Sequence, residues 1–400
     1  MLETCPACGV PGLEDFYVQS RVPVNSLLLL ADADAARAFP TAPLTLASCA
    51  ACGFVTNRLF DPAMTKYSAD YEETQGFSPR FRQFASSLAQ DWVERYALAG
   101  AEVLEIGCGK GEFLAEMVRA GAGTGLGYDP VYRPGRLPED VVGSLTFRPI
   151  DFDRSASGVR ADAVVCRHTL EHVPDVQRFL TDVREVFADQ PQTVLLFEVP
   201  DVQRILDEAA FWDVFYEHCS YFSAGSLVRL FEACGLDVLR VERVFDQQYL
   251  VIEARIGARS TASGPEVVPR RAPSPLEDDL DRLRAGVQHF RSTMASTADR
   301  WRSVIQDVRR SGGHVVLWGS GSKSVSFLTT VGVDDEVDFV VDINPHKQGT
   351  YNAGTGQRIV APEELLEIEP ALVVVMNPVY EQEITEQLTG LGLHPDIRTL

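Results

Sequence analysis

Short apolar runs alternate with amphipathic stretches along two parts of this chain. In the first part, from about residue 80 to 256, the segment "FRQFASSLAQDWVERYAL" carries apolar residues at helical spacing and leads into apolar runs such as "EVLEI" and "ADAVVC". A second alternation begins at His314 and continues to residue 400. Short apolar runs separated by amphipathic helices are typical of parallel α/β sheets. The pattern therefore predicts two α/β domains.

The segments outside these two parts differ in composition. Residues 1–75 hold two cysteine pairs and are expected to contain few regular elements. The stretch "GARSTASGPEVVPRRAPSP", residues 257–275, is rich in Ser, Gly, Pro and Arg, which favours a linker, and a charged helical stretch follows it. We therefore expect an α/β protein in four parts: a small N-terminal domain (1–75), a central Rossmann-like domain (76–256), a linker and helix (257–311), and a second, C-terminal Rossmann-like domain (312–400).

Four of the eight cysteines form two CxxC pairs, and each pair is followed by glycine. The four residues are Cys5, Cys8, Cys49 and Cys52. Two such pairs complete a tetrahedral shell of four thiolates, which leaves no position for water, so the spacing predicts one structural zinc ion. Four unliganded buried cysteines or a redox-active CxxC are the alternatives. The other cysteines lie in apolar contexts and are expected in the core.

A glycine-rich turn follows the apolar run "EVLEI". In "AEVLEIGCGKGEFLAEMVRAG", Gly107, Gly109 and Gly111 separate a predicted strand from a predicted amphipathic helix. Glycine lets a ligand lie against the backbone, and a helix N-terminus favours negative charge. Glu105 stands two residues before the first glycine. The turn predicts a nucleotide-type ligand, without specifying which one.

Two further acids follow the next two predicted strands. Asp129 ends "GTGLGYDP", where an acid can bind ribose hydroxyls, and Asp151 precedes Phe152 in "PIDFD". This series resembles the class I S-adenosylmethionine-dependent methyltransferases, and "VLEIGCGKG" looks like their first motif. The resemblance implies that the glycines line the methionine part of the cofactor, that Asp129 holds its ribose, and that Asp151 and Phe152 lie near the adenine. A dinucleotide-binding oxidoreductase is the alternative, but its GxGxxG pattern is not matched.

A second glycine turn opens the C-terminal alternation. In "GGHVVLWGSGSKSVSFLTTVG", Gly319 and Gly321 lie between a predicted strand and a predicted helix, with Lys323 at the helix start. A following strand, "VDFVVDINP", carries Asp342 near its end. The arrangement favours a site for a phosphate-bearing substrate at Gly319, Gly321 and Lys323. The alternative is a structural α/β domain whose loop binds no ligand.

The segment "FYEHCSYFSAGSLVRLF" (215–231) places Glu217 and His218 side by side among aromatic residues. Ser223 is a predicted helix N-cap, so the pair lies just before a helix. Imidazole titrates near neutrality and can remove a proton. The alternative is a buried histidine that only satisfies its own loop.

The order of these features resembles the deoxysugar C-methyltransferases, which methylate nucleotide-linked ketosugars in antibiotic pathways. The resemblance covers nearly the whole chain. It implies that His218 is the base that removes the proton alpha to the ketone, with Glu217 orienting it or stabilising charge. It also implies that His172, in "RHTLEHVPD", and Tyr216 line the same pocket, and that the C-terminal domain helps to hold the nucleotide.

Two departures from that family affect the expected acceptor. A tyrosine common two residues before the glutamate is Phe215 here, and the family's His-Gly-Gly stretch is replaced by "VFDQQYLVIEA". An O- or N-methyltransferase for another small metabolite is therefore the alternative enzyme. The alternative that is not an enzyme is a metal-organised protein that uses both nucleotide folds as sensors.

The charge balance limits the partners. A formal net charge of -21 with no basic stripe argues against a nucleic-acid reader or an anionic membrane surface. The stretch "MLETCPACGV" shows neither a basic nor an apolar leader region, and the longest apolar run, "SLLLLADA", is too short to span a bilayer. We expect a cytoplasmic enzyme that binds a small-molecule substrate, such as a nucleotide-sugar. We expect it to bind neither nucleic acid nor membrane.

Overall fold

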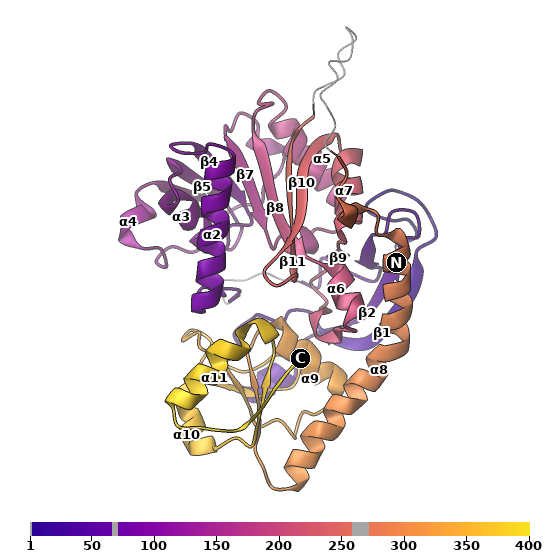
Figure 1. The fold of residues 1–400 in the computed structure, drawn as a ribbon, viewed down its shortest axis with the longest axis vertical. Helices are drawn as coiled ribbons and strands as arrows, with labels where there is room; N and C mark the ends of the chain where they lie inside the picture. Colours follow the sequence, from indigo (N-terminus) through magenta and orange to yellow (C-terminus); the bar gives the residue numbers. More distant parts are fainter. Residues whose placement is uncertain (1, 66–70, 258–271) are drawn as a thin grey trace.

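The computed structural model describes residues 2–65, 71–257 and 272–400 of the chain. It has a mixed α/β fold with three sheets among these residues, which confirms the predicted class (Figure 1). Most of the predicted linker lies outside the described residues.

The first sheet is antiparallel and lies near the N-terminus. Its strands, in spatial order, are β1 (Glu14–Pro23), β2 (Thr41–Ser48), β3 (Val55–Asn57) and β9 (Ser220–Tyr221), with the short helix α1 (Ala33–Arg37) between β1 and β2. The expectation of few regular elements here was wrong. The β1–β2 pairing contains two register shifts, so the two-residue alternation that signals a strand is broken in the sequence. The fourth strand comes from the central part of the chain.

The second sheet has seven strands in the order β10-β11-β8-β7-β4-β5-β6. The strands are β4 (Glu102–Ile106), β5 (Thr124–Tyr128), β6 (Leu145–Arg148), β7 (Ala163–Arg167), β8 (Val194–Pro200), β10 (Leu236–Val244) and β11 (Tyr249–Ile256). Only β11 runs antiparallel to its neighbours. The strand order reverses between β4 and β7, which is where open α/β sheets bind ligands, beyond the carboxyl ends of the strands.

Helices cover both faces of this sheet. Their bounds are α2 (Pro79–Arg95), α3 (Glu112–Arg119), α4 (Glu139–Val142), α5 (Val176–Val186), α6 (Val202–Asp207) and α7 (Ala224–Ala233). Apolar residues of α2 and α3 share one buried cluster with the sheet, and those of α5 and α7 share another. Ser223 caps α7 through a capping box, as predicted, because its hydroxyl accepts from the backbone N–H of Ser226.

The third sheet is parallel, in the order β14-β13-β12-β15-β16. Its elements are β12 (Val315–Trp318), α9 (Ser322–Val331), β13 (Phe339–Val341), β14 (Arg358–Val360), α10 (Leu365–Ile368), β15 (Leu372–Val375), α11 (Glu381–Gly390) and β16 (Asp396–Thr399). The long helix α8 (Leu280–Arg310) connects it to the rest of the molecule and contacts α6, α9 and β1 (Figure 1). Among the described helices, none combines the length and the apolar character needed to cross a bilayer.

Candidate active site

A cavity of about 850 Å³ lies where the carboxyl ends of the parallel strands of the second and third sheets face each other. This volume is toward the large end of the range for small-molecule sites. Most of the predicted site residues line it: Glu105, Gly107, Gly109, Asp129, Asp151, Phe152, His172, Glu217, His218, Gly319, Gly321 and Lys323. The cavity thus joins both glycine turns to the histidine-bearing loops.

Two predicted site residues do not line this cavity. Gly111 is the N-cap of α3 with a φ of 81°, and a Cβ added there would lie 2.5 Å from the Phe147 ring. Tyr216 is buried, and its hydroxyl accepts a hydrogen bond from the backbone N–H of Asp61 at 3.0 Å. The structure therefore gives Gly111 a conformational role and Tyr216 a packing role.

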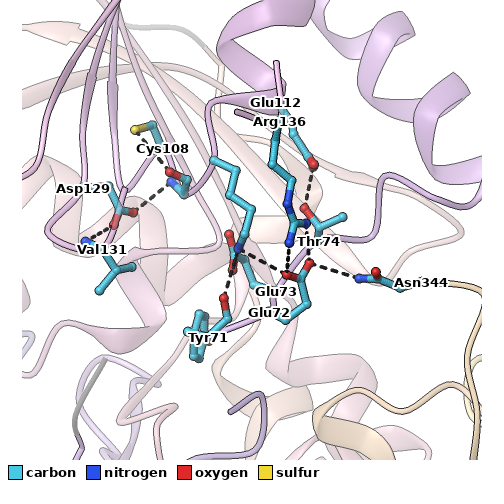
Figure 2. Close-up of polar contacts among 12 residues, drawn as sticks. Tyr71, Glu72, Glu73, Thr74, Cys108, Glu112, Asp129, Val131, Arg136 and Asn344 are labelled. Carbon is cyan, nitrogen blue, oxygen red and sulfur yellow. Dashed lines mark hydrogen bonds and ion pairs between the residues drawn. The ribbon is translucent and has the colours of Figure 1, made fainter. Parts of the chain in front are cut away.

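The first glycine turn is held by Asp129. Its carboxylate accepts from the backbone N–H of Gly109 at 2.8 Å and from that of Val131 at 2.9 Å (Figure 2). Gly107 has a φ of 70°, and a Cβ there would lie 2.1 Å from Thr169 Oγ1, so only glycine fits. A carboxylate offers about four lone pairs, so Asp129 retains capacity for ligand hydroxyls.

Glu105 gives the cavity a buried acceptor. It is 3% exposed, and within the described part of the chain its Oε2 has no hydrogen-bond partner. Burial raises the pKa of Glu105 to about 8, although the nearby Arg167 guanidinium opposes this. Phe152 packs edge-on against Tyr128 with ring centroids 5.3 Å apart. A glycine turn, a buried carboxyl group with an unpartnered oxygen and an aromatic wall fit S-adenosylmethionine, whose positive charge would favour the ionised form of Glu105.

Residues 71–78, which we call the cover segment, lie over the first glycine turn. Thr74 donates to the Glu112 carboxylate at 2.7 Å, on the helix that follows this turn. Ser78 donates to Glu383 at 2.8 Å, in the C-terminal part of the molecule. The cover segment therefore connects the second and third sheets across the cavity.

Glu72 is the most connected residue of the cover segment. Its carboxylate accepts from Arg136 at 2.6 Å and from Asn344 Nδ2 at 3.0 Å, with Lys110 Nζ 3.9 Å away (Figure 2). Burial opposes its ionisation, but these partners outweigh burial and lower the pKa of Glu72. Asn344 lies beyond β13, so this buried carboxylate links the two nucleotide-type folds.

His172 and His218 meet edge to face inside the cavity, with ring centroids 4.7 Å apart. The Nδ1 of His172 lies 3.1 Å from the backbone carbonyl of Glu217. A carbonyl can only accept, so Nδ1 carries the proton and Nε2 the lone pair in neutral His172. Burial lowers the pKa of both histidines, His218 more strongly. Both imidazoles are therefore neutral near pH 7.

The Glu217 carboxylate is bound by Ser26, although Glu217 is adjacent to His218 in sequence. Its carboxylate accepts from the backbone N–H of Ser26 at 3.0 Å and from the Ser26 hydroxyl. The Ser26 hydroxyl also lies 2.6 Å from that of Ser322 at the start of α9. Burial raises the pKa of Glu217 to about 7. Three distant segments of the chain thus converge on this carboxylate.

At the second glycine turn, Gly319 and Gly321 lie at the cavity wall and Lys323 stands in the first turn of α9, as predicted. The Lys323 ammonium pairs with Asp213, which also pairs with Arg204. Burial lowers the pKa of Lys323 to about 8, although Asp213 opposes this. Arg204 also pairs with Glu208 at 2.7 Å, so the two cations of this wall are matched by two carboxylates.

Asp342 repeats at the second turn the arrangement of Asp129 at the first. Its Oδ2 accepts from the backbone N–H of Ser320 at 3.0 Å and from the Ser320 hydroxyl at 2.6 Å. Lys347 Nζ lies 3.7 Å from the same carboxylate. Lys347 is therefore a third cation at this end of the cavity, and it is buried.

The four cysteines of the CxxC pairs come together near the first sheet. Cys5 and Cys52 have sulfur atoms 3.6 Å apart, as do Cys8 and Cys49. Four sulfurs bound to zinc at about 2.3 Å would lie about 3.8 Å from one another, so the observed spacing fits a tetrahedral four-thiolate site. These residues would hold a structural ion, remote from the residues that line the cavity.

Sequence reasoning missed the cover segment and two residues of the loop after β7, His168 and Glu171, which also line the cavity. The cover segment carries no local motif, because its partners lie far away in the sequence. Glu171 had a usable signal, since it precedes His172 directly in "TLEHVPD".

Comparison with known proteins agrees with this geometry. Residues 81–241 match a family model described as a methyltransferase domain, and residues 277–392 match one described as a C-methyltransferase C-terminal domain. The C-methyltransferase NovU of Streptomyces niveus is 26% identical over 397 residues, covering 96% of this chain and 92% of its own. The chain is an S-adenosylmethionine-dependent methyltransferase. The second model and the full-length relative further support a C-methyltransferase.

Other relatives of this methyltransferase match only part of it. The ubiquinone biosynthesis O-methyltransferase of Acinetobacter baumannii is 36% identical over 97 residues, 22% of this chain and 40% of its own length. A solved structure of the Burkholderia thailandensis 1,6-didemethyltoxoflavin-N1-methyltransferase covers 44% of this chain and 79% of its own, with a TM-score of 0.35 and 19% identity.

Replacing Asp129 by alanine is expected to weaken S-adenosylmethionine binding by roughly 1.5 to 3 kcal/mol, the range for hydrogen bonds to a charged group. The change removes the predicted ribose acceptor and also releases the backbone N–H of Gly109. Calorimetry with the cofactor measures the loss. Asp140→Ala, at an exposed position, is the control and should bind normally. Unchanged affinity in Asp129→Ala, or tighter binding of NAD than of S-adenosylmethionine, would overturn this assignment.

Proposed function

We propose that this enzyme methylates the carbon alpha to a ketone in a nucleotide-linked sugar, or in a comparable activated carbonyl metabolite, after His218 removes the alpha proton. The observation that carries the proposal is the single cavity shared by the two glycine turns, with His172 and His218 at its wall. A cofactor at the first turn and an acceptor that reaches the second turn would then meet beside the histidines.

The chemistry needs a base, because a carbon alpha to a carbonyl is a poor nucleophile until it loses its proton. In the proposed step, the lone pair of His218 takes that proton, and the electrons of the C–H bond move toward the carbonyl oxygen. The resulting nucleophilic carbon forms a bond to the methyl group that S-adenosylmethionine supplies, and the C–S bond electrons remain on sulfur. His218 then returns its proton to solvent. The lowered pKa of His218 keeps its imidazole neutral before the reaction.

The wall of the cavity at the second glycine turn favours an acceptor with a negatively charged group. Lys323, Arg204 and Lys347 all line it, and a bound anion could take them over from their carboxylate partners Asp213, Glu208 and Asp342. Gly319 and Gly321 leave room for a phosphate to approach the backbone at the start of α9. These features suit the diphosphate of a nucleotide-linked sugar, and a role in deoxysugar formation for an antibiotic is part of the proposal. A structural zinc ion on the four cysteines completes it.

The position of the transferred methyl group tests this proposal. With methyl-labelled S-adenosylmethionine and a nucleoside-diphosphate-linked 4-ketohexose as probe, we expect the label on carbon, as a new carbon–carbon correlation in the NMR spectrum of the product. The label should survive acid conditions that cleave methyl ethers. Loss of the label under those conditions would instead identify an O-methyltransferase, the activity of the relatives that match a shorter part of the chain.

A further inference from the structure

A second glutamate lies closer to the histidine pair than Glu217 does. Glu171 follows β7 in a short 3-10 turn and lines the cavity at 2% exposure. One of its carboxylate oxygens and one ring nitrogen each of His172 and His218 lie within 4.8 Å of one another. Among the described residues, its Oε2 has no hydrogen-bond partner. A buried carboxylate with one unpartnered oxygen thus lies beside the two imidazoles.

The backbone fixes this arrangement. The carbonyl of Glu171 accepts from the backbone N–H of Cys219 at 3.0 Å, and the carbonyl of Glu217 lies 3.1 Å from His172 Nδ1. The loop after β7 and the segment before β9 are therefore joined by two hydrogen bonds next to the histidine pair. Meanwhile the Glu217 carboxylate is occupied by Ser26, on the other side of its segment.

We propose that Glu171, rather than Glu217, is the carboxylate that stabilises the imidazolium formed when the His172–His218 pair accepts a proton. This inference rests on the proposed function. Glu171 acts through the histidines and is therefore a positioning residue. Proton abstraction creates a positive charge in a buried site, and a nearby anion lowers the cost of that charge, as in other base–carboxylate pairs.

His168 lies between Glu171 and a second buried carboxylate, Glu198. Its Nε2 lies 2.8 Å from Glu198 and its Nδ1 lies 3.6 Å from Glu171. Burial lowers the pKa of His168, but the two carboxylates outweigh burial and raise it to about 9. His168 also has a left-handed φ of 48°, a strained conformation of the kind that clusters at functional sites.

The charges around the pair oppose one another. His168 and Lys323 disfavour a proton on His218, and His168 disfavours one on His172. Glu171 favours a proton on His172, together with the Glu217 carbonyl. The remaining side chains packed on His218 are aromatic, Phe215 and Tyr221. Of the charged side chains that influence the pair, Glu171 is the one that favours the protonated form.

Histidine titration by NMR tests this inference on the full-length protein and needs no acceptor. Wild type is compared with Glu171→Gln, with Glu217→Gln and with Glu185→Gln, a surface control. Glu171→Gln should lower the proton affinity of His172 at least about tenfold, which equals one pKa unit. Glu217→Gln should change it less than Glu171→Gln does, and Glu185→Gln should leave it unchanged.

A titration of His172 that is unchanged in Glu171→Gln, or changed more in Glu217→Gln, would overturn the inference.

Metal analysis provides another check, because Glu171, His172 and His218 also have a spacing that suits a metal ion. A second metal equivalent that is present in wild type and lost in Glu171→Gln would make Glu171 a ligand and overturn the inference. If Glu171→Gln does not fold, Glu171→Asp keeps the charge and should shift the titration less than tenfold. An O-methylated product would refute the proposed function without changing this titration.

Discussion

Replacing His218 by glutamine should lower turnover by about 10² to 10⁴, the usual contribution of a positioned base, and leave S-adenosylmethionine binding intact. Glutamine keeps a polar side chain of similar size but cannot take up the alpha proton. His218 contacts the rings of His172 and Phe215, and its segment is held by backbone bonds that the substitution leaves in place. Single-turnover kinetics and cofactor calorimetry measure the two quantities separately.

The matched control is His289→Gln, at an exposed position of α8 that should not affect turnover. A histidine with only a structural role would give another result, in which His218→Gln loses stability and cofactor affinity together. A folded His218→Gln protein that binds the cofactor and turns over at nearly the wild-type rate would refute the base assignment. His172 would then be the base to test.

Removing the metal from the four-cysteine site is expected to inactivate the enzyme, although the site lies outside the catalytic cavity. Residues Val55 and Thr56 of β3 follow the second cysteine pair and pair with β9, which begins two residues after His218. The Thr56 hydroxyl donates to the Cys219 carbonyl at 2.8 Å. Since ligand binding and folding are coupled at such sites, loss of the metal should loosen both strands and the segment that holds His218.

We therefore expect Cys49→Ser to bind no stoichiometric zinc and to show faster hydrogen exchange in residues 55–57 and 216–221 than wild type. Cofactor affinity should fall less than turnover, because the first glycine turn belongs to the second sheet. Cys234→Ser changes a buried cysteine outside the cluster and should keep its zinc. Purified wild type without a stoichiometric metal would contradict the zinc assignment.

Features encoded over short stretches of sequence could be predicted. The glycine turns, the acid at the end of β5 and the cap of α7 each depend on a strand, a turn and a helix within about 20 residues, so spacing and periodicity are sufficient. The first sheet was not foreseen, because bulges interrupt the alternation of β1 and its last strand comes from residues 220–221.

Side-chain directions in the cavity could not be predicted, because they depend on remote partners. Glu217 turns toward Ser26, which is 191 positions away, and Glu72 reaches Asn344, 272 positions away. The sequence alone does not show these contacts, and it therefore predicts Glu217, the neighbour of His218, as the partner of that histidine. The structure instead brings Glu171 close to His218, and Glu171 precedes Glu217 by 46 positions in the sequence.

The central claim is proton removal from carbon before methyl transfer, and an acceptor deuterated at the alpha carbon tests it most directly. With a nucleoside-diphosphate-linked 4-ketohexose labelled in this way, wild type should release one deuteron to solvent for each methyl group transferred. His218→Gln should slow release and transfer together. A methylated product that retains all of its alpha deuterium would contradict the account, because the methyl group would then have been transferred without any deprotonation of that carbon.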